Sequence, residues 1–403
     1  MKNLIRVLYY IYIILIFIFP IRINSNVYLA SIVAIIISSI IGIQILLNKE
    51  KYKRNKNSII SILILLSISY IAYQIFQIII LRDSIVFHME KIGPVLLLIM
   101  SYKYLRKNKD LANILVDFIK KVIVISIVSW GIFYLFKISR VDIIRKSIDV
   151  IKFSEPLTLY GEVRFEWLTR HKSEFAVLCI FFSIFIINIF KSRLIKVGLL
   201  ICCFIGILLS KSNTSLIVYL FIGFISISIS IITSIKNINL RIVFTTLYFI
   251  ISGGGLILYS NKIYRILQGI LENRNLSTLG SRTFIWGSAI TTLKNNYLGY
   301  GSKVGENFIP NGFYSFTTYS NAHNSYLQDF LESGVVGGVI FILISIIIIL
   351  ILLKNNLNSG ILYLAIIIIN QMDIGLLRIN MHLMYLIVTI ILLKNEKIIL
   401  EKV

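Results

Sequence analysis

Charged side chains are scarce in this 403-residue chain, where they make up 15% of the residues against 57% for hydrophobic ones. An ordinary soluble domain carries about 25% charged residues. The apolar residues also come in long runs rather than in amphipathic stripes. This scarcity excludes an ordinary soluble domain and indicates a polytopic membrane protein.

Acidic residues are scarcer still, with 18 Asp and Glu against 41 Lys and Arg and a net charge of +23. Such an excess can indicate a nucleic-acid partner, but no basic block here lies on a soluble, aromatic-bearing domain. Most of the lysines fall between the apolar runs. We therefore interpret the charge as contact with the membrane surface and expect no nucleic acid to bind.

Cysteine is also rare, and all three cysteines lie inside apolar runs (Cys179, Cys202 and Cys203). Their positions favour neither disulfides nor a metal site, so we interpret them as small hydrophobic residues. The sequence lacks nucleotide-binding glycine motifs, HExxH, GxSxG and any Asp-rich cluster. These absences argue against the enzyme classes that depend on such motifs, and we expect no cofactor and no metal.

The apolar runs predict an all-α protein with about twelve transmembrane helices, each about 20 residues long. The first resembles a signal peptide but lacks a small-x-small cleavage site, so we expect it to be retained as a helix. The expected spans are 4–20, 27–47, 58–81, 86–102, 119–138, 173–190, 197–210, 215–234, 242–260, 330–353, 360–375 and 380–393.

Basic residues in the short loops predict the orientation of these helices. Loops 48–57, 103–110 and 191–196 are rich in Lys and Arg and fall on one side, which is therefore cytoplasmic and holds both termini. The long loops 139–172 and 261–325 are then external. Neither is long enough for a separate globular domain, so we expect residues 1–403 to form a single polytopic membrane domain.

The second external loop carries two segments with helical periodicity. Residues 262–272 are expected to lie in the membrane interface. Residues 281–294 are expected to form a helix with Ser281 as its N-cap. The apolar face of that helix consists of Ile285, Trp286, Ala289 and Leu293. Glycines then predict turns at Gly299, Gly301, Gly305 and Gly312.

Two residues of this loop are the main candidates for chemistry. Arg282 opens the predicted helix, and a helix N-terminus with a guanidinium is a favourable phosphate site. His323 lies where the loop enters the next span, and an imidazole there fits general-base chemistry on a phosphate-activated substrate. The alternatives are a solvated arginine at a helix start and a hydrogen-bonded structural histidine.

Further cations lie on the expected external side. A cluster before the sixth span would gather an anion, although the same residues could be side chains that snorkel at the interface. It consists of Arg164, Arg170, His171 and Lys172, with Glu174 next to them. Lys211 lies in the turn "SKSNTS", which could equally be a plain polar hairpin. Aromatic residues crowd both loops and could line a sugar path or seat the loops at the membrane.

The order of these motifs resembles the O-antigen ligase/polymerase superfamily. Its Arg-xxx-Trp helix, Gly-x-Gly turn and His-Asn-xx-Leu segment are similar to "SRTFIW", "LGYG" and "HNSYL" here. The element "RFEWLTRHKSEFA" is similar to an upstream Arg-containing motif, and "SKSNTS" to a Ser-Arg turn. At that turn Asn213 stands where arginine often occurs, so Lys211 would have to supply the positive charge.

The resemblance implies a metal-independent, inverting glycosyltransferase of the integral-membrane (GT-C) type in the bacterial cytoplasmic membrane. The donor would be a glycan on undecaprenyl pyrophosphate, and the partners an acceptor glycan, membrane lipids and other polysaccharide-assembly proteins. His323 would be the base and Arg282 would bind pyrophosphate, with the other cations near it. The remaining residues of the motif would support them: Asn324 as a helix cap or orienter of the imidazole, and Trp286 in substrate binding.

Three functions stay open at this point. The first is a polymerase that extends a lipid-linked repeat unit, and the second a ligase that moves finished glycan to a lipid A core or a protein. The third, a flippase or transporter, predicts charges buried inside spans and discontinuous helices in matching halves. The sequence shows few charges inside the expected spans and no convincing repeat, which argues against transport.

Overall fold

The computed structural model describes residues 2–17, 26–48, 58–136, 167, 172–210, 212–234, 282–308, 322, 324–371 and 379–395. All regular structure in these ranges is helical, as the sequence predicts. The helices are α1 (Lys2–Phe17), α2 (Asn26–Leu47), α3 (Ser58–Leu81), α4 (Ile85–Lys107), α5 (Lys109–Leu135), α7 (Lys172–Ile189), α8 (Arg193–Leu209), α9 (Asn213–Ser234), α12 (Arg282–Asn295), η3 (Gly301–Lys303), α13 (Val304–Asn307), α14 (Ser325–Asn355), α15 (Leu357–Asn370) and α16 (Ile379–Asn395).

Each predicted span other than 242–260, which lies outside the described residues, has a helical counterpart. The largest difference concerns the predicted loop 103–110. Helices α4 and α5 run through it, and only Asn108 is non-helical. Hydropathy marks only the apolar part of a helix, whereas Lys, Leu and Ala residues with good helix propensity prolong it on either side.

Four helices in the described ranges are long and apolar enough to cross a membrane: Tyr28–Leu47, Ile59–Leu81, Ile85–Lys107 and Ser325–Asn355. Shorter apolar helices accompany them in α7, α9, α15 and α16. Many of their outward residues are large and apolar, which suits contact with lipid. The protein is therefore an integral membrane protein.

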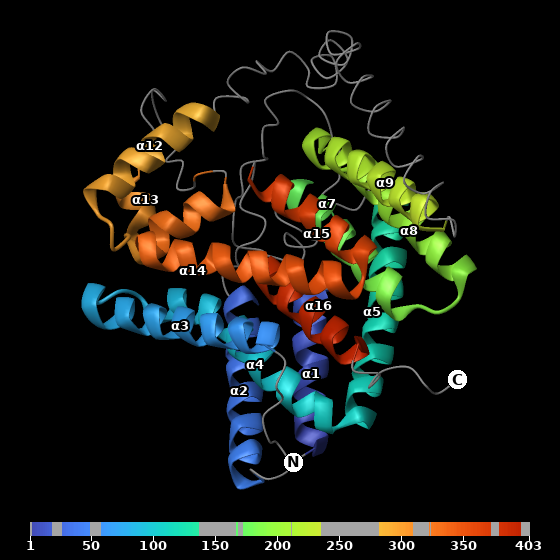
Figure 1. Cartoon of the computed structure of the whole chain (residues 1–403), viewed down its shortest axis with the longest axis horizontal. Coiled ribbons are helices and arrows are strands. Elements are labelled where there is room, and N and C mark those ends of the chain that lie inside the picture. Colours follow the sequence, from blue (N-terminus) through green and yellow to red (C-terminus); the bar gives the residue numbers. More distant parts are fainter. Residues whose placement is uncertain are drawn as a thin grey trace.

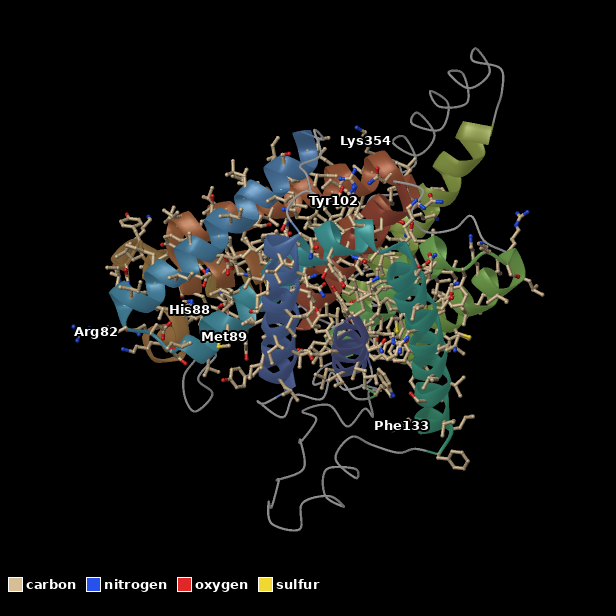
Figure 2. The ribbon with its side chains drawn as sticks, turned by 90° about the horizontal axis from the view of Figure 1, so that it is seen from below. Arg82, His88, Met89, Tyr102, Phe133 and Lys354 are labelled. Atoms are coloured by element: carbon tan, nitrogen blue, oxygen red, sulfur yellow. The ribbon has the colours of Figure 1, made fainter. Side chains whose placement is uncertain are left out.

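The candidate functional region lies where α3, α4, α12 and α14 meet. Helix α14 runs alongside α3, and α12 sits beside the start of α14 (Figure 1). Helix α4 joins this region to α2, where a Cβ added to Gly93 would lie only 2.9 Å from the carbonyl oxygen of Ser31. Figure 2 shows Arg82 at one edge of the molecule and His88, at the start of α4, further in.

Candidate active site

Helix α14 has a capped start and a break one third of the way along. The side-chain oxygen of Asn324 accepts hydrogen bonds from the N–H groups of Tyr326 (3.0 Å) and Leu327 (3.1 Å). This confirms Asn324 as the expected cap. At Gly334 the backbone leaves the helix with φ 68° and ψ −175°. We call residues 325–333 the polar half of α14 and residues 335–355 its apolar half.

The predicted glycine turn packs directly against this break. Gly299 and Gly301 have φ of 86° and 57°, in the left-handed region that favours glycine. A Cβ added to Gly299 would lie 2.3 Å from the Gly334 nitrogen, and one added to Gly334 would lie 2.4 Å from the Leu298 carbonyl carbon. The N–H of Val335 donates to the Tyr297 carbonyl at 2.9 Å. The turn therefore supplies the hydrogen bond that α14 loses at its break.

Helix α12 packs on the same region through the apolar face that the sequence predicts. Ile285 and Ala289 are buried, and Leu293 packs beside them. They belong to a small apolar cluster whose other buried members are Val304, Phe308, Ala322 and Leu331. The half-buried Trp286 donates from Nε1 to the carbonyl oxygen of Ala322 at 3.1 Å. Thus the helix that begins at Arg282 contacts the segment that leads into α14.

The backbone of Ala322 is held from two sides. Its N–H donates to Oε1 of Gln328 at 2.8 Å, and its carbonyl accepts from Trp286. Asn324 is held as the cap of α14. The residues on either side of His323 are therefore fixed against α12 and α14, whereas His323 itself lies outside the described residues.

The other predicted site residues lie wholly or partly outside the described residues. Arg164, Arg170, His171 and Lys211 are outside them. The backbone of Lys172 starts α7 and that of Arg282 starts α12, and their side chains are not described. Their roles stay predictions. The cysteines are free thiols, as expected, and Cys179 and Cys203 are buried.

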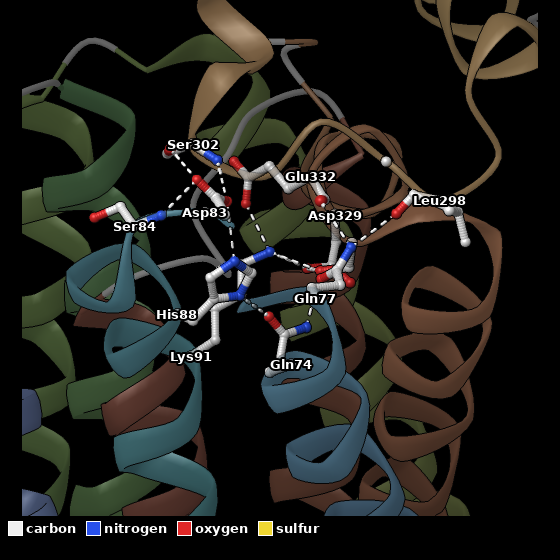
Figure 3. A network of polar contacts seen from close by, with 12 residues as sticks. Gln74, Gln77, Asp83, Ser84, His88, Lys91, Leu298, Ser302, Asp329 and Glu332 are labelled. Atoms are coloured by element: carbon white, nitrogen blue, oxygen red, sulfur yellow. Dashed lines mark hydrogen bonds and ion pairs between the residues drawn. The ribbon is translucent and has the colours of Figure 1, made fainter. Parts of the chain in front are cut away.

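The structure adds a buried ionic cluster that sequence reasoning missed. Lys91 of α4 lies with Nζ 2.8 Å from Asp329 Oδ1 and 2.8 Å from Glu332 Oε2, both in the polar half of α14 (Figure 3). Nζ also donates to Ser333 Oγ at 2.9 Å, and Tyr70 donates its hydroxyl to Asp329 Oδ1 at 3.1 Å. A lysine placed between two carboxylates offsets part of the cost of burying all three charges.

The cluster continues to the turn between α3 and α4. His88 lies between Asp83 Oδ2 (3.0 Å) and Gln74 Oε1 (2.7 Å), and Gln74 donates from Nε2 to Ser333 Oγ at 3.0 Å. Asp83 also accepts hydrogen bonds from the backbone N–H (2.7 Å) and the hydroxyl of Ser302. Figure 3 shows these groups converging from α3, α4, α14 and the glycine turn.

The environment of Asp83 has two opposing effects on its acidity. Burial alone would raise the pKa of this carboxyl, but hydrogen bonds from Ser302, Ser84 and His88 favour the charged form. The hydrogen bonds prevail, and the pKa of Asp83 lies below its ordinary value. Asp83 is therefore an anion at neutral pH that anchors the glycine turn.

The few charges inside the expected spans include members of this cluster. Lys91 and Glu332 lie within expected spans, and Asp329 immediately precedes one. Averaged hydropathy hides them because each is surrounded by apolar residues. Their pairing joins segments far apart in the chain, which sequence spacing cannot show. The usable signal was the pair of stretches "HMEK" and "QDFLES" inside apolar runs.

Residues 197–342 match the family model described as O-antigen ligase. This confirms the resemblance to the O-antigen ligase/polymerase superfamily. Members of that family are glycosyltransferase-like enzymes, and the family implies lipid-linked glycan substrates. The matched range includes α12, the glycine turn and the break in α14. It does not include α4, which supplies Lys91, or the turn between α3 and α4, which supplies Asp83. A comparison with curated proteins finds no match.

Proposed function

We propose that this protein is a polysaccharide polymerase of bacterial surface glycan assembly, such as O-antigen or capsule. It would transfer glycan from undecaprenyl pyrophosphate onto a lipid-linked repeat unit at the outer face of the cytoplasmic membrane. The contact of Trp286 with Ala322 carries the proposal, because it joins the helix that begins at Arg282 to the segment that contains His323. These are the two residue types that the reaction requires.

The reaction needs a cation for the leaving group and a base for the acceptor. Arg282 binds the pyrophosphate through its planar, bidentate guanidinium, helped by Arg164, Arg170, His171, Lys172 or Lys211. His323 takes the proton from the acceptor hydroxyl as that oxygen attacks the anomeric carbon. The new glycosidic bond forms as the bond to pyrophosphate breaks on the opposite face, so the centre is inverted.

The proposal includes a topology of about twelve spans in one membrane domain, with both termini cytoplasmic and loops 139–172 and 261–325 external. Ser302, in the second of these loops, bonds to Asp83 in the α3–α4 turn, which the same topology also makes external. Single-cysteine labelling at Asn311, in a background without native cysteines, tests it. Labelling only after permeabilisation would overturn both the topology and the site.

The main test uses purified protein with a lipid-linked donor. His323→Ala and His323→Gln should insert and bind donor normally but lose about 10²–10⁴-fold in elongation rate, as removal of a general base does. Wild-type activity should rise with pH as the imidazole loses its proton, and chelators should not change it. Elongation by His323→Ala near the wild-type rate would remove His323 as the base, leaving His171 or Glu174.

A paired test addresses the pyrophosphate site. Arg282→Lys keeps the charge but loses the bidentate geometry, so it should retain partial activity, whereas Arg282→Ala should retain almost none. Near-wild-type turnover in both variants would exclude Arg282 from the site.

A ligase that transfers glycan to a lipid A core or a protein would use the same groups. Acceptor competition distinguishes the two functions: a polymerase gives a ladder of longer lipid-linked glycans from donor alone, while a ligase gives product only when its own acceptor is added.

One observation favours a transporter: α14 is broken, and buried charges lie in its polar half. However, these charges bond to one another, and Asp83 of the same network anchors the glycine turn. A structural role in an enzyme site accounts for them. Uptake of labelled lipid-linked glycan into vesicles without any elongation would favour the transporter instead.

A further inference from the structure

We propose that Gln328 is a positioning residue that fixes the backbone next to His323, and that Lys91 holds it in place through Glu332. The inference rests on the proposed function, in which His323 is the base. It goes further by connecting α4, outside the matched range, to the reacting group.

Three short contacts in series carry the proposal. The N–H of Ala322 donates to Gln328 Oε1 at 2.8 Å, and Gln328 Nε2 donates to Glu332 Oε1 at 2.7 Å. The other oxygen of Glu332 lies 2.8 Å from Lys91 Nζ. Gln328 and Glu332 are only 4% and 5% exposed, so water does not compete for these bonds.

The partners of Gln328 leave its amide one orientation. A backbone N–H can only donate, and a carboxylate can only accept, so Oε1 must face Ala322 and Nε2 must face Glu332. Since Lys91 holds Glu332, the orientation of these hydrogen bonds is set from Lys91 of α4 toward Ala322. This fixed order of donors and acceptors distinguishes a positioning contact from simple packing.

The residues before and after His323, Ala322 and Asn324, are held by three sets of hydrogen bonds. Gln328 holds the N–H of Ala322, Trp286 holds its carbonyl, and Asn324 caps α14 immediately after. Both chain neighbours of His323 are therefore held in place. Displacing a catalytic group by about 1 Å can cost about 10²-fold in rate, so loss of the Gln328 contact should appear in kcat.

An exchange experiment on the purified full-length protein tests this with one pair of side chains. Gln328→Glu keeps an acceptor for Ala322 but sets a second buried carboxylate against Glu332, so we expect kcat to fall about 10–100-fold. Glu332→Gln keeps an acceptor for Gln328 and should cost less. The double exchange restores one amide and one carboxylate in reversed order, and its kcat should return to within a few-fold of wild type.

The KM for lipid-linked donor should stay unchanged in all three variants, because Arg282 is untouched. A matched control is Asn188→Leu, which removes a buried amide that bonds Ser359 Oγ at 2.6 Å between α7 and α15. It should lower thermal stability without changing kcat. Here kcat is expressed for each folded molecule, and size-exclusion chromatography gives the amount of folded protein.

The outcomes separate the two proposals. If His323→Ala keeps wild-type turnover, His323 is not the base, and the proposed active site fails at that residue. If His323→Ala is inactive but Gln328→Glu matches Asn188→Leu in kcat, only the positioning role of Gln328 fails. Failure of the double exchange to recover kcat, with normal folded yield, would equally overturn the chain from Lys91 through Glu332.

Discussion

The two halves of α14 are held by different physics. In the polar half, every buried side chain except Leu331 is polar or charged: Ser325, Gln328, Asp329, Glu332 and Ser333. In the apolar half the buried side chains are mainly large and apolar, such as Phe341, Ile344 and Ile348. The buried hydroxyl there, on Ser345, donates to the Phe341 carbonyl one turn earlier.

The contacts of the polar half specify the position of the helix, whereas those of the apolar half only fill space. A slip of one residue in the polar half would leave a carboxylate facing no cation, which costs several kcal/mol. A slip in the apolar half would exchange one apolar contact for another or for lipid, and lipid is as apolar as the side chains themselves. We therefore expect the polar half to set the geometry of the proposed site and the apolar half to anchor it in the membrane. The following variants test that division, from the largest expected effect to the smallest.

Gly334→Ala, at the boundary, should have the largest effect. A backbone with φ 68° and ψ −175° is essentially restricted to glycine. Placing another residue in this conformation costs about 1–3 kcal/mol. The new Cβ would also overlap the backbone of Leu298 at 2.4 Å. We expect little folded protein on size-exclusion chromatography and no elongation.

Gly131→Ala in α5 is the matched control, because an added Cβ there has no neighbour within 4 Å in the described structure. It should leave stability unchanged or raise it by about 0.5–1 kcal/mol, since Ala is the better helix former. Equal folded yields for Gly334→Ala and Gly131→Ala would mean that α14 does not need its break.

Lys91→Met comes next. It leaves Asp329 and Glu332 buried without a cation, and breaking such a pair costs about 3–5 kcal/mol. Asp329 is especially dependent on it, because its Oδ2 has no hydrogen-bond partner among the described residues. Thermal unfolding in detergent should show a large decrease in Tm. Adding Asp329→Asn and Glu332→Gln should recover part of it, and no recovery would show that Lys91 acts by packing alone.

Sequence reasoning predicted the parts of this region that depend on local pattern. The helix at α12, its apolar face, the turns at Gly299 and Gly301 and the cap at Asn324 all follow from periodicity and residue type within a few positions. Hydropathy also located the helices, because lipid exposure imposes long apolar runs.

It did not predict contacts between distant segments. Nothing in the local sequence joins Lys91 to Asp329, or Asp83 to Ser302, because such pairs depend on how the helices pack. The break at Gly334 was missed for the same reason. A glycine in an apolar run is predicted to be helical from its sequence context. Only the structure shows that the turn at Leu298 and Gly299 occupies the space beside Gly334.

Asp83 should give an intermediate, pH-dependent effect. Its pKa is depressed in the folded state, so the carboxylate adds stability above its unfolded pKa of about 3.9, and this is lost as pH falls through the lower folded value. Asp83→Asn should lower Tm at neutral pH and flatten the further decrease below about pH 4. Parallel Tm-against-pH curves for the variant and wild type would contradict this anchoring role.

The smallest effect should come from the apolar half, where the same substitution can be made on two faces two residues apart. Ile348 is 0% exposed and packs in the main apolar core, whereas Ile346 is 45% exposed on the outer face. Ile348→Val removes one buried methyl group and should cost about 0.5–1.5 kcal/mol, since the space left behind is not refilled. Ile346→Val removes a group that lipid or detergent replaces, so its Tm should match wild type. Both variants should keep wild-type kcat, because neither aliphatic side chain can take part in the hydrogen bonds and ion pairs of the polar half. A decrease in kcat for Ile348→Val at full folded yield would show that the two halves are coupled across Gly334, and the division between position and packing would then be wrong.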